Sequence, residues 1–280
     1  MRDDTFMQLM RIVPKGVLST AVGHATRAPA PPAVHQLAIK AFAQRYGVNL
    51  DEAERPVEDY RTFAEFFTRR LKPGIRAVDP GEHVVVSPVD GSVSQIGYAE
   101  EGECIQAKGV RFSLQTLLAD SVEADRFAGG AYATLYLSPR DYHRIHAPLS
   151  GAISGYRYLP GEFWPVNRAS VRMREGLFCA NERLITWMDT PAGRTAVVKV
   201  GATCVSRIRV TYDDVITHTG GEATVHGYVS PIPIAKGEEL GVFEMGSTVV
   251  LLFERGRVKW DAGLREESEV RMGQRLGEWQ

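Results

Sequence analysis

Three short stretches of this 280-residue chain carry the side chains best suited to chemistry. "SPVDGSV" places Asp90 in a turn before a glycine, and "SPRDYHRIHAPLSG" places His143 and His146 three residues apart. "FEMGSTVVLLF" places Ser247 in a tight Gly-Ser-Thr turn before an apolar strand. Each stretch also has an ordinary structural explanation, because Asp, Gly and Ser favour turns and histidines are frequent on surface loops. The stretches acquire a chemical meaning only if the fold brings them together.

The same side chains can be combined into two different reactive sites. A zinc site of two histidines and one carboxylate would use His143, His146 and Asp90. His-x-x-His is a weaker signal than the His-Glu-x-x-His motif of zinc peptidases, and no general base accompanies it. A nucleophilic site would use Ser247, with a histidine to remove its proton and Asp90 to orient that histidine. The sequence contains no Gly-x-Ser-x-Gly motif, which argues against an α/β-hydrolase.

The composition is that of a globular protein, with 44% hydrophobic and 24% charged residues. A net charge of −1 provides no general attraction for nucleic acid, so we expect no nucleic-acid partner. No apolar stretch is long enough for a transmembrane helix. The N-terminus lacks a basic start followed by an apolar core, which predicts that the chain begins its life in the cytoplasm. An odd cysteine count without a Cys-x-x-Cys pair indicates a reducing compartment and no cysteine zinc site: Cys104, Cys179 and Cys204.

The first 75 residues have a helical pattern with many large apolar side chains. Pro14 should break the first helix, whose apolar residues are Phe6, Leu9, Met10, Val13 and Val17. Residues 24–35 resemble a Pro/Ala linker, and a second helix follows with Val34, Leu37, Ala38, Ala41 and Phe42. Thr62 and Glu65 form a capping box that starts a third helix. The third helix is expected to pack on the main domain, whereas the first two could either pack there or anchor the chain at a membrane surface.

From about residue 82 the pattern changes to short strands separated by Gly, Pro and Asp turns. Only residues 112–127 interrupt it with a helical pattern. There is no regular alternation of strands and helices and no phosphate-binding glycine motif, so nucleotide-binding folds are not indicated. We therefore expect a mainly β (α+β) protein: a helical region at 1–75, and an antiparallel β-sandwich or barrel-like catalytic domain at 76–280.

Several motifs in order give the chain a resemblance to a known family. They are "YRTFAEFFTRRLKPG", "SPVDGSVSQIG", "IQAKG" followed by "FSLQTLLA", "YLSPRDYHRIHAP", "YLPGEFWPVN", "NER", "VGATCVSRI" and "FEMGSTVVLLF". Over about residues 38–277 the chain resembles the bacterial phosphatidylserine decarboxylases. Met245 stands where the family often has leucine before Gly-Ser-Thr, which is a change between similar apolar side chains.

The resemblance implies a proenzyme that cleaves itself between Gly246 and Ser247. Ser247 would attack the Gly246 carbonyl and convert the amide into an ester. β-Elimination of that ester and hydrolysis of the resulting dehydroalanine would release ammonia and leave a pyruvoyl group. By the same resemblance, Asp90, His146 and Ser247 form the self-cleavage triad, with His146 as the base and Asp90 as its orienter.

The resemblance also implies the later reaction, the decarboxylation of phosphatidylserine to phosphatidylethanolamine and carbon dioxide. Its cofactor would be the covalent pyruvoyl group derived from Ser247, whose ketone forms a Schiff base with the substrate amine and accepts the electron pair left by carbon dioxide. His143 matches the histidine assigned to this step and could reprotonate the carbon. Neither a metal nor pyridoxal phosphate would be required.

The partners implied are a lipid and the two products of cleavage. The substrate lies in a bilayer, which favours peripheral association of the first two helices with the cytoplasmic side of the cell membrane. Cleavage would give a heterodimer of a large and a small chain, and the resemblance suggests that this unit forms a homodimer. The residues by themselves also leave two other classes of function possible: a zinc hydrolase, and a non-catalytic lipid-binding β-sandwich.

Overall fold

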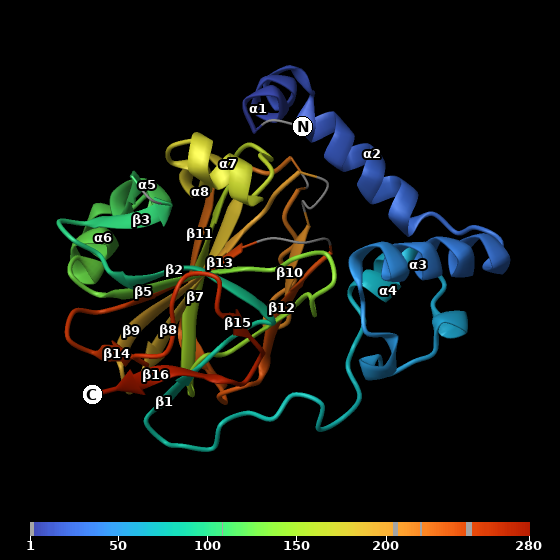
Figure 1. The fold of residues 1–280 in the computed structure, drawn as a ribbon. Helices are drawn as coiled ribbons and strands as arrows, with labels where there is room; N and C mark the ends of the chain where they lie inside the picture. The colour runs from blue at the N-terminus through green and yellow to red at the C-terminus, as the bar shows by residue number, and fades with distance from the viewer. Residues whose placement is uncertain (1–2, 108, 204–206, 219, 245–247) are drawn as a thin grey trace.

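The structure is a computed structural model, and the residues that it describes are 3–107, 109–203, 207–218, 220–244 and 248–280. Gly246 and Ser247, and with them the predicted cleavage bond, lie outside the described residues. Helices come first in the chain and strands dominate from residue 84 onward (Figure 1). The helices are α1 (Asp3–Ile12), α2 (Lys15–Arg27), α3 (Pro32–Tyr46), α4 (Phe63–Phe67), α5 (Leu114–Leu118), α6 (Ser121–Phe127), α7 (Arg168–Met173) and α8 (Leu177–Ala180), with 3₁₀ turns at Leu50–Glu52 and Val57–Asp59.

In the described ranges the strands form one large sheet and three small ones, and every pairing between these strands is antiparallel. The eight-stranded sheet has the order β11 (Thr224–Ile234), β7 (Gly151–Leu159), β8 (Arg183–Thr190), β9 (Gly193–Val200), β13 (Thr248–Phe253), β5 (Ala131–Tyr136), β2 (Gly91–Tyr98) and β15 (Glu269–Val270). The small sheets are β10 (Ile208–Val210), β12 (Glu239–Phe243) and β6 (Arg144–His146); β1 (Val84–Val86), β16 (Arg275–Trp279) and β14 (Val258–Trp260); and the pair β3 (Glu103–Ala107) and β4 (Val110–Ser113).

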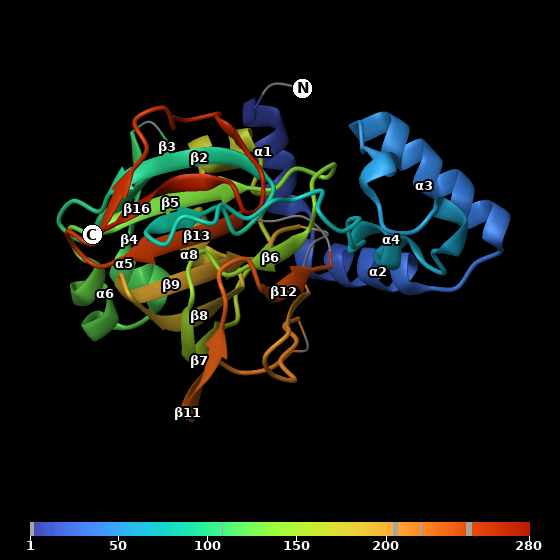
Figure 2. The same ribbon diagram turned by 90° about the horizontal axis from the view of Figure 1, so that it is seen from below.

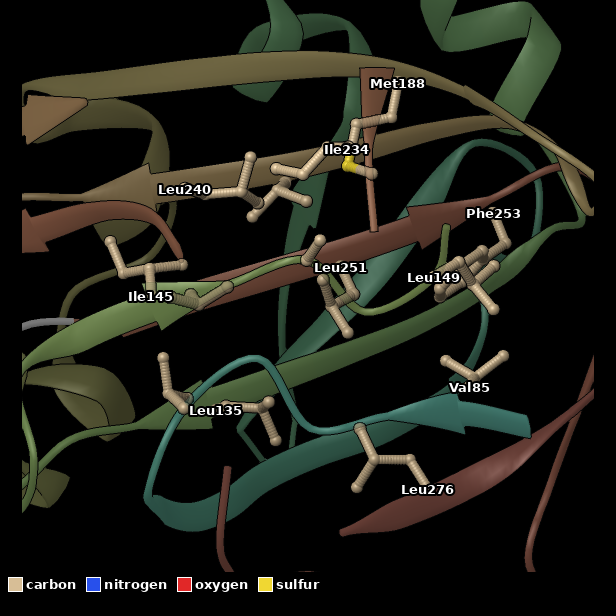
Figure 3. Close-up of a cluster of buried hydrophobic side chains, with 14 of the residues drawn as sticks. Val85, Leu135, Ile145, Leu149, Met188, Ile234, Leu240, Leu251, Phe253 and Leu276 are labelled. Atoms are coloured by element: carbon tan, nitrogen blue, oxygen red, sulfur yellow. The ribbon is translucent and has the colours of Figure 1, made fainter. Parts of the chain in front are cut away.

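Strand β13 is apolar throughout because it lies in the middle of the large sheet and both of its faces are buried. Val249, Leu251 and Phe253 face a core shared with the two three-stranded sheets (Figure 3). Val250 and Leu252 face a second core, which the helices α5 and α8 help to cover. The large sheet is thus the central layer, with the two three-stranded sheets on one face, and short helices together with the β3–β4 pair on the other.

The expectation of a mainly β, antiparallel α+β fold is confirmed. In the described residues the large sheet does not close into a barrel, because its edge strands β11 and β15 are different strands that do not pair with each other. The helical interruption predicted at 112–127 is present as α5 and α6. The expectation that no other helix interrupts the strands is wrong, since α7 and α8 lie between β7 and β8.

The N-terminal helices follow their local signals closely. Pro14 separates α1 from α2, and the Thr62 hydroxyl caps α4 by accepting a 3.1 Å hydrogen bond from the Glu65 amide. The predicted linker at 24–35 is too long, because α2 continues to Arg27 and α3 starts at Pro32. None of the described helices is both long and apolar enough to span a membrane. Figure 1 shows α1 beside α7 and α8, with α2 leading from it to α3 and α4, which lie to one side of the strands (Figure 2).

Lys199 on β9 is a lysine whose side chain is fully buried in the core. Its Nζ donates to the Thr186 hydroxyl and lies 3.4 Å from the carbonyl oxygen of Val197, and among the described residues it has no carboxylate partner. Burial lowers the pKa of Lys199 to about 7. The amine is therefore close to losing its proton at neutral pH, because the charged form is poorly solvated there.

Replacing Lys199 with methionine should raise the free energy of unfolding, by a few kcal/mol at pH 7 as an order of magnitude. Since the folded pKa lies below the unfolded one, the unfolded chain binds more protons between about pH 7 and 10.5, and wild-type stability should rise with pH in that window. Lys199→Met should remove most of this slope. Urea unfolding between pH 7 and 9, in a Ser247→Ala background that keeps one covalent chain, measures both effects. Lys259→Met, at an exposed position of β14, is the control, and an equal gain there would contradict the prediction.

Candidate active site

The segment that contains Gly246 and Ser247 connects the small sheet of β12 to the centre of the large sheet. At its start, the Phe243 amide donates a 3.0 Å hydrogen bond to the carbonyl oxygen of His143. At its end, Thr248 pairs with Tyr136 on β5 and with Val200 on β9. The described residues on both sides of the predicted cleavage bond therefore lie next to the His143 backbone and the end of β5.

Asp90 lies at the same end of β5, on the side away from β13. Gly91 follows it, and a Cβ at position 91 would meet the carbonyl oxygen of Tyr136 at 2.2 Å, so only glycine permits this close approach of β2 and β5. Tyr136 on β5 pairs with Ser92 of β2 on one edge of the strand and with Thr248 of β13 on the other. With neighbouring strands about 4.8 Å apart, the two chain segments are separated by about 10 Å.

His146 on β6 is held by two hydrogen bonds to its ring. Its Nδ1 lies 2.8 Å from the carbonyl oxygen of Gly237, so Nδ1 carries the proton and donates it. In the neutral ring Nε2 is then the basic nitrogen, and it accepts a 3.2 Å hydrogen bond from the Tyr142 hydroxyl. Burial lowers the pKa of His146, although the Gly237 hydrogen bond and the negative charges of Glu239 and Asp90 oppose this. The ring is therefore a neutral base at neutral pH.

His143 precedes β6 and is completely buried. Its Nδ1 donates a 2.8 Å hydrogen bond to the carbonyl oxygen of Asp141, and its ring packs on Phe67 with 4.1 Å between ring centres. Among the described residues, Nε2 has no hydrogen-bond partner. Burial, with a smaller contribution from Arg69, lowers the pKa of His143 to about 3. A buried imidazole with a bare ring nitrogen is a group that can accept a proton from a ligand or from a neighbouring segment.

The Asp90 carboxylate is bound by an arginine rather than by a histidine. Arg76 donates from Nε to both carboxylate oxygens, at 2.9 and 3.0 Å, and its Nη2 also contacts Glu52 at 2.7 Å. The amide of Met272 adds a 2.8 Å hydrogen bond to Asp90. Asp90, Arg76 and Glu52 line a cavity of about 320 Å³ that also reaches Tyr142.

The structure thus brings Asp90, His143 and His146 to one region without a direct hydrogen bond between Asp90 and either imidazole among the described residues. The carbonyl of Gly237 orients His146, and Asp90 influences that ring through its charge. The predicted role of Asp90 as the orienter therefore remains a prediction. The backbone joins the two segments, since the His146 amide donates to the carbonyl oxygen of Pro88 at 2.8 Å.

Three contributors to this region were not predicted from the sequence. Tyr142 stands inside the histidine motif and could have been noticed there, because a phenol four residues before His146 is a potential hydrogen-bond donor to it. Arg76 and Gly237 are distant in sequence from the groups that they bind and carry no recognisable signal of their own.

The side chains of the zinc alternative do not form a ligand set in the part of the chain that the structure describes. No three histidine, cysteine, aspartate or glutamate side chains gather there in a way that could hold a metal ion. Asp90 is engaged by Arg76 instead, in an ion pair that supplies its countercharge.

The structure shows an antiparallel β-domain in which two buried histidines lie near the described residues on either side of the Gly-Ser-Thr segment, and comparison with known proteins shows the class to which it belongs. Residues 63–278 match the sequence model of the phosphatidylserine decarboxylase family. The phosphatidylserine decarboxylase proenzyme of Myxococcus xanthus (strain DK1622) is 62% identical over 277 residues, covering 99% of both chains. Those of Anaeromyxobacter sp. (strain K) and Brevibacillus brevis are 53% and 43% identical, covering 99% and 96% of this chain and 99% and 95% of their own.

The chain belongs to the phosphatidylserine decarboxylase family, a family of enzymes. The resemblance drawn from the motifs is confirmed. The relatives are described as proenzymes, a word that refers to those proteins and is consistent with processing at the Gly-Ser-Thr segment.

Proposed function

We propose that this chain decarboxylates phosphatidylserine to phosphatidylethanolamine and carbon dioxide, after cleaving itself between Gly246 and Ser247. The observation that carries the proposal is the convergence of His143, His146 and Asp90 on the described ends of the Gly-Ser-Thr segment. Family membership supports the reaction.

For self-cleavage, the Ser247 hydroxyl needs a base, and His146 offers a neutral ring with Nε2 as the proton acceptor. Because the Tyr142 hydroxyl occupies that nitrogen, the serine proton would pass to the Tyr142 oxygen while the Tyr142 proton passes to Nε2. The Ser247 oxygen then bonds to the Gly246 carbonyl carbon, and the Gly246–Ser247 amide bond breaks as His146 returns the proton to the leaving nitrogen, which gives the ester and a free amine. The imidazolium formed in between lies within reach of the negative charges of Asp90 and Glu239.

The residues present fit a carbonyl cofactor formed at position 247, because His143 offers it a buried nitrogen that has no partner among the described residues. A pyruvoyl group supplies a ketone that takes up the substrate amine and draws electrons away as carbon dioxide leaves. His143, with a bare Nε2, would take up a proton when the negative charges of the substrate enter the site, because they favour the charged ring, and would return that proton to the substrate carbon. The same imidazole would then serve as acceptor first and donor second.

The lipid substrate requires contact with a bilayer, and the N-terminal helices offer a suitable surface. Large apolar side chains are exposed there, although they would be expected to be buried if the helices only packed on the β-domain: Leu9, Ile12, Val17, Leu18, Val34 and Leu37. Most of the predicted apolar side of α3 is exposed, with Val34 at 56% and Leu37 at 71%. Its Phe42 instead packs against the core that Ile39 and Ala43 enter. Peripheral association with the cytoplasmic side of the cell membrane through these helices is part of the proposal. The proposal also includes the heterodimer of the large and small chains and the homodimer formed by two such heterodimers.

An intact mass spectrum of the purified protein tests the proposed function directly. We expect a large chain of residues 1–246 and a small chain of 34 residues, 247–280. The small chain should be lighter by one ammonia than the same peptide with an N-terminal serine, and it should resist Edman degradation. Hydroxylamine or an amine with cyanoborohydride should add to it, because it begins with a ketone.

The two other classes of function give different spectra. A zinc hydrolase would remain one chain and lose activity to a chelator, and a lipid-binding β-sandwich would remain one chain and bind liposomes without turnover. A small chain with a free serine amine would indicate ordinary proteolysis and would contradict the proposal at its first chemical step.

A further inference from the structure

Glu244, two residues before Gly246, is held by two arginines from different parts of the chain. Arg27 at the end of α2 contacts the Glu244 carboxylate at 3.1 Å, and Arg207 contacts the same oxygen at 3.7 Å. The Glu244 amide also donates a 2.9 Å hydrogen bond to the carbonyl oxygen of Arg207. The last described residue before the predicted cleavage bond is therefore fixed through both its side chain and its backbone.

The helix that supplies Arg27 is docked on the β-domain. Met7 and Met10 of α1 are buried in the core on the helix-covered face of the large sheet, and the Thr20 hydroxyl of α2 lies 3.0 Å from Nε2 of His218. The other side of the same helices is apolar and exposed, with Ile12 at 82% and Val17 at 69%. One pair of helices thus presents apolar side chains outward and binds the segment leading to the cleavage bond with its inner side.

We infer that Arg27 and Arg207 are positioning residues for self-cleavage, which they promote by holding Glu244. Helix α2 then contributes to self-cleavage through Arg27 and to the membrane-facing surface through its exposed apolar side chains. This inference rests on the proposed function, because it requires that the Gly246–Ser247 bond is cleaved by the chain itself.

The ion pairs of Glu244 would affect the geometry of the attack more than the stability of the fold. The Arg27 side chain is 33% exposed and that of Glu244 19% exposed, and ion pairs so open to water contribute little to folding. An intramolecular attack on a carbonyl is, however, sensitive to displacements of about 1 Å. Phe243 is anchored to His143 and Thr248 is anchored in the large sheet, so Glu244 is the point where side-chain contacts can adjust the path between them.

The test follows cleavage of the full-length chain as it is made. A pulse–chase in a cell-free translation system, read on denaturing gels, gives the first-order rate of conversion to the two chains. We expect Arg27→Gln to slow cleavage about five- to tenfold and Glu244→Gln to slow it more, since that change releases both arginines. Arg27→Gln should add nothing in the Glu244→Gln background, and Arg27→Lys should recover most of the rate.

Lys40→Gln is the matched control. Lys40 lies on α3, is 57% exposed and pairs with Glu58 at 3.3 Å, so its replacement removes one positive charge from the same helical region without touching Glu244. It should cleave at the wild-type rate, and both single variants should float equally with phosphatidylglycerol-containing vesicles. Thermal unfolding of the fully processed proteins should be unchanged, which separates positioning from folding.

The possible negative results distinguish an error in the inference from an error in the proposed function. If wild-type chain cleaves but Arg27→Gln matches it, or slows only as much as Lys40→Gln, the inference is wrong and the proposed function stands. Additive effects of Arg27→Gln and Glu244→Gln would also overturn it, because the two groups would then act separately. If the wild-type chain never cleaves between Gly246 and Ser247, the proposed function and the inference fail together.

Discussion

Ser247→Ala should leave one uncleaved chain of 280 residues with no decarboxylase activity. Alanine has no oxygen to attack the Gly246 carbonyl and no leaving group for the elimination, so neither the cut nor the ketone can form. The loss should be complete rather than partial, because no other residue can provide the cofactor. Intact mass and release of carbon dioxide from phosphatidylserine in mixed micelles measure the two consequences.

Ser247→Thr tests the same position more finely. Its hydroxyl can attack, but the extra methyl crowds the turn, so we expect slow cleavage and a small chain that begins with a ketobutyryl group. Thr248→Ser is a control with the neighbouring hydroxyl and should cleave as the wild type does. Cleavage of Ser247→Ala at the same bond would show that position 247 is not the nucleophile.

The two histidines should fail at different stages. His146→Ala should remain a single chain, slowed by about 10²- to 10⁴-fold in cleavage, because the base that receives the serine proton is missing. His143→Ala should still cleave, yet decarboxylate poorly, because its bare Nε2 is required only for proton transfer to and from the substrate. Time courses of chain conversion, followed by turnover assays on the cleaved product, separate the two effects.

Both rings are buried, so folding must be checked by circular dichroism and thermal unfolding. His143→Asn and His146→Gln leave smaller cavities and serve as second variants. His83→Ala, at an exposed position, should change neither step. If both buried-histidine variants remain uncleaved, the division of labour between them is wrong, although the class of enzyme is not.

The sequence by itself determined the features that depend on neighbours within a few residues. Pro14 breaks a helix and Thr62 caps one because backbone geometry and a side chain three residues away suffice. The apolar run from Val249 to Phe253 indicates a strand buried on both faces, and it is one. The candidate reactive residues were also recognisable, since their motifs are local and the resemblance to the family depends on them.

Only the tertiary structure decided which groups the reactive side chains meet. Asp90 is bound by Arg76 and His146 by Gly237, contacts that join residues 14 and 91 positions apart in the chain. No local pattern encodes them, because Arg76, Asp90 and Gly237 lie in connecting segments whose positions depend on how the sheets pack. The exposed apolar side of α3 was also beyond the sequence, because the pattern marks an apolar surface and the packing decides which part of the helix the protein covers. The ion pair of Arg27 with Glu244 also depends on tertiary structure. No sequence pattern links the two charges, and the fold places α2 against the segment that precedes the proposed cleavage bond.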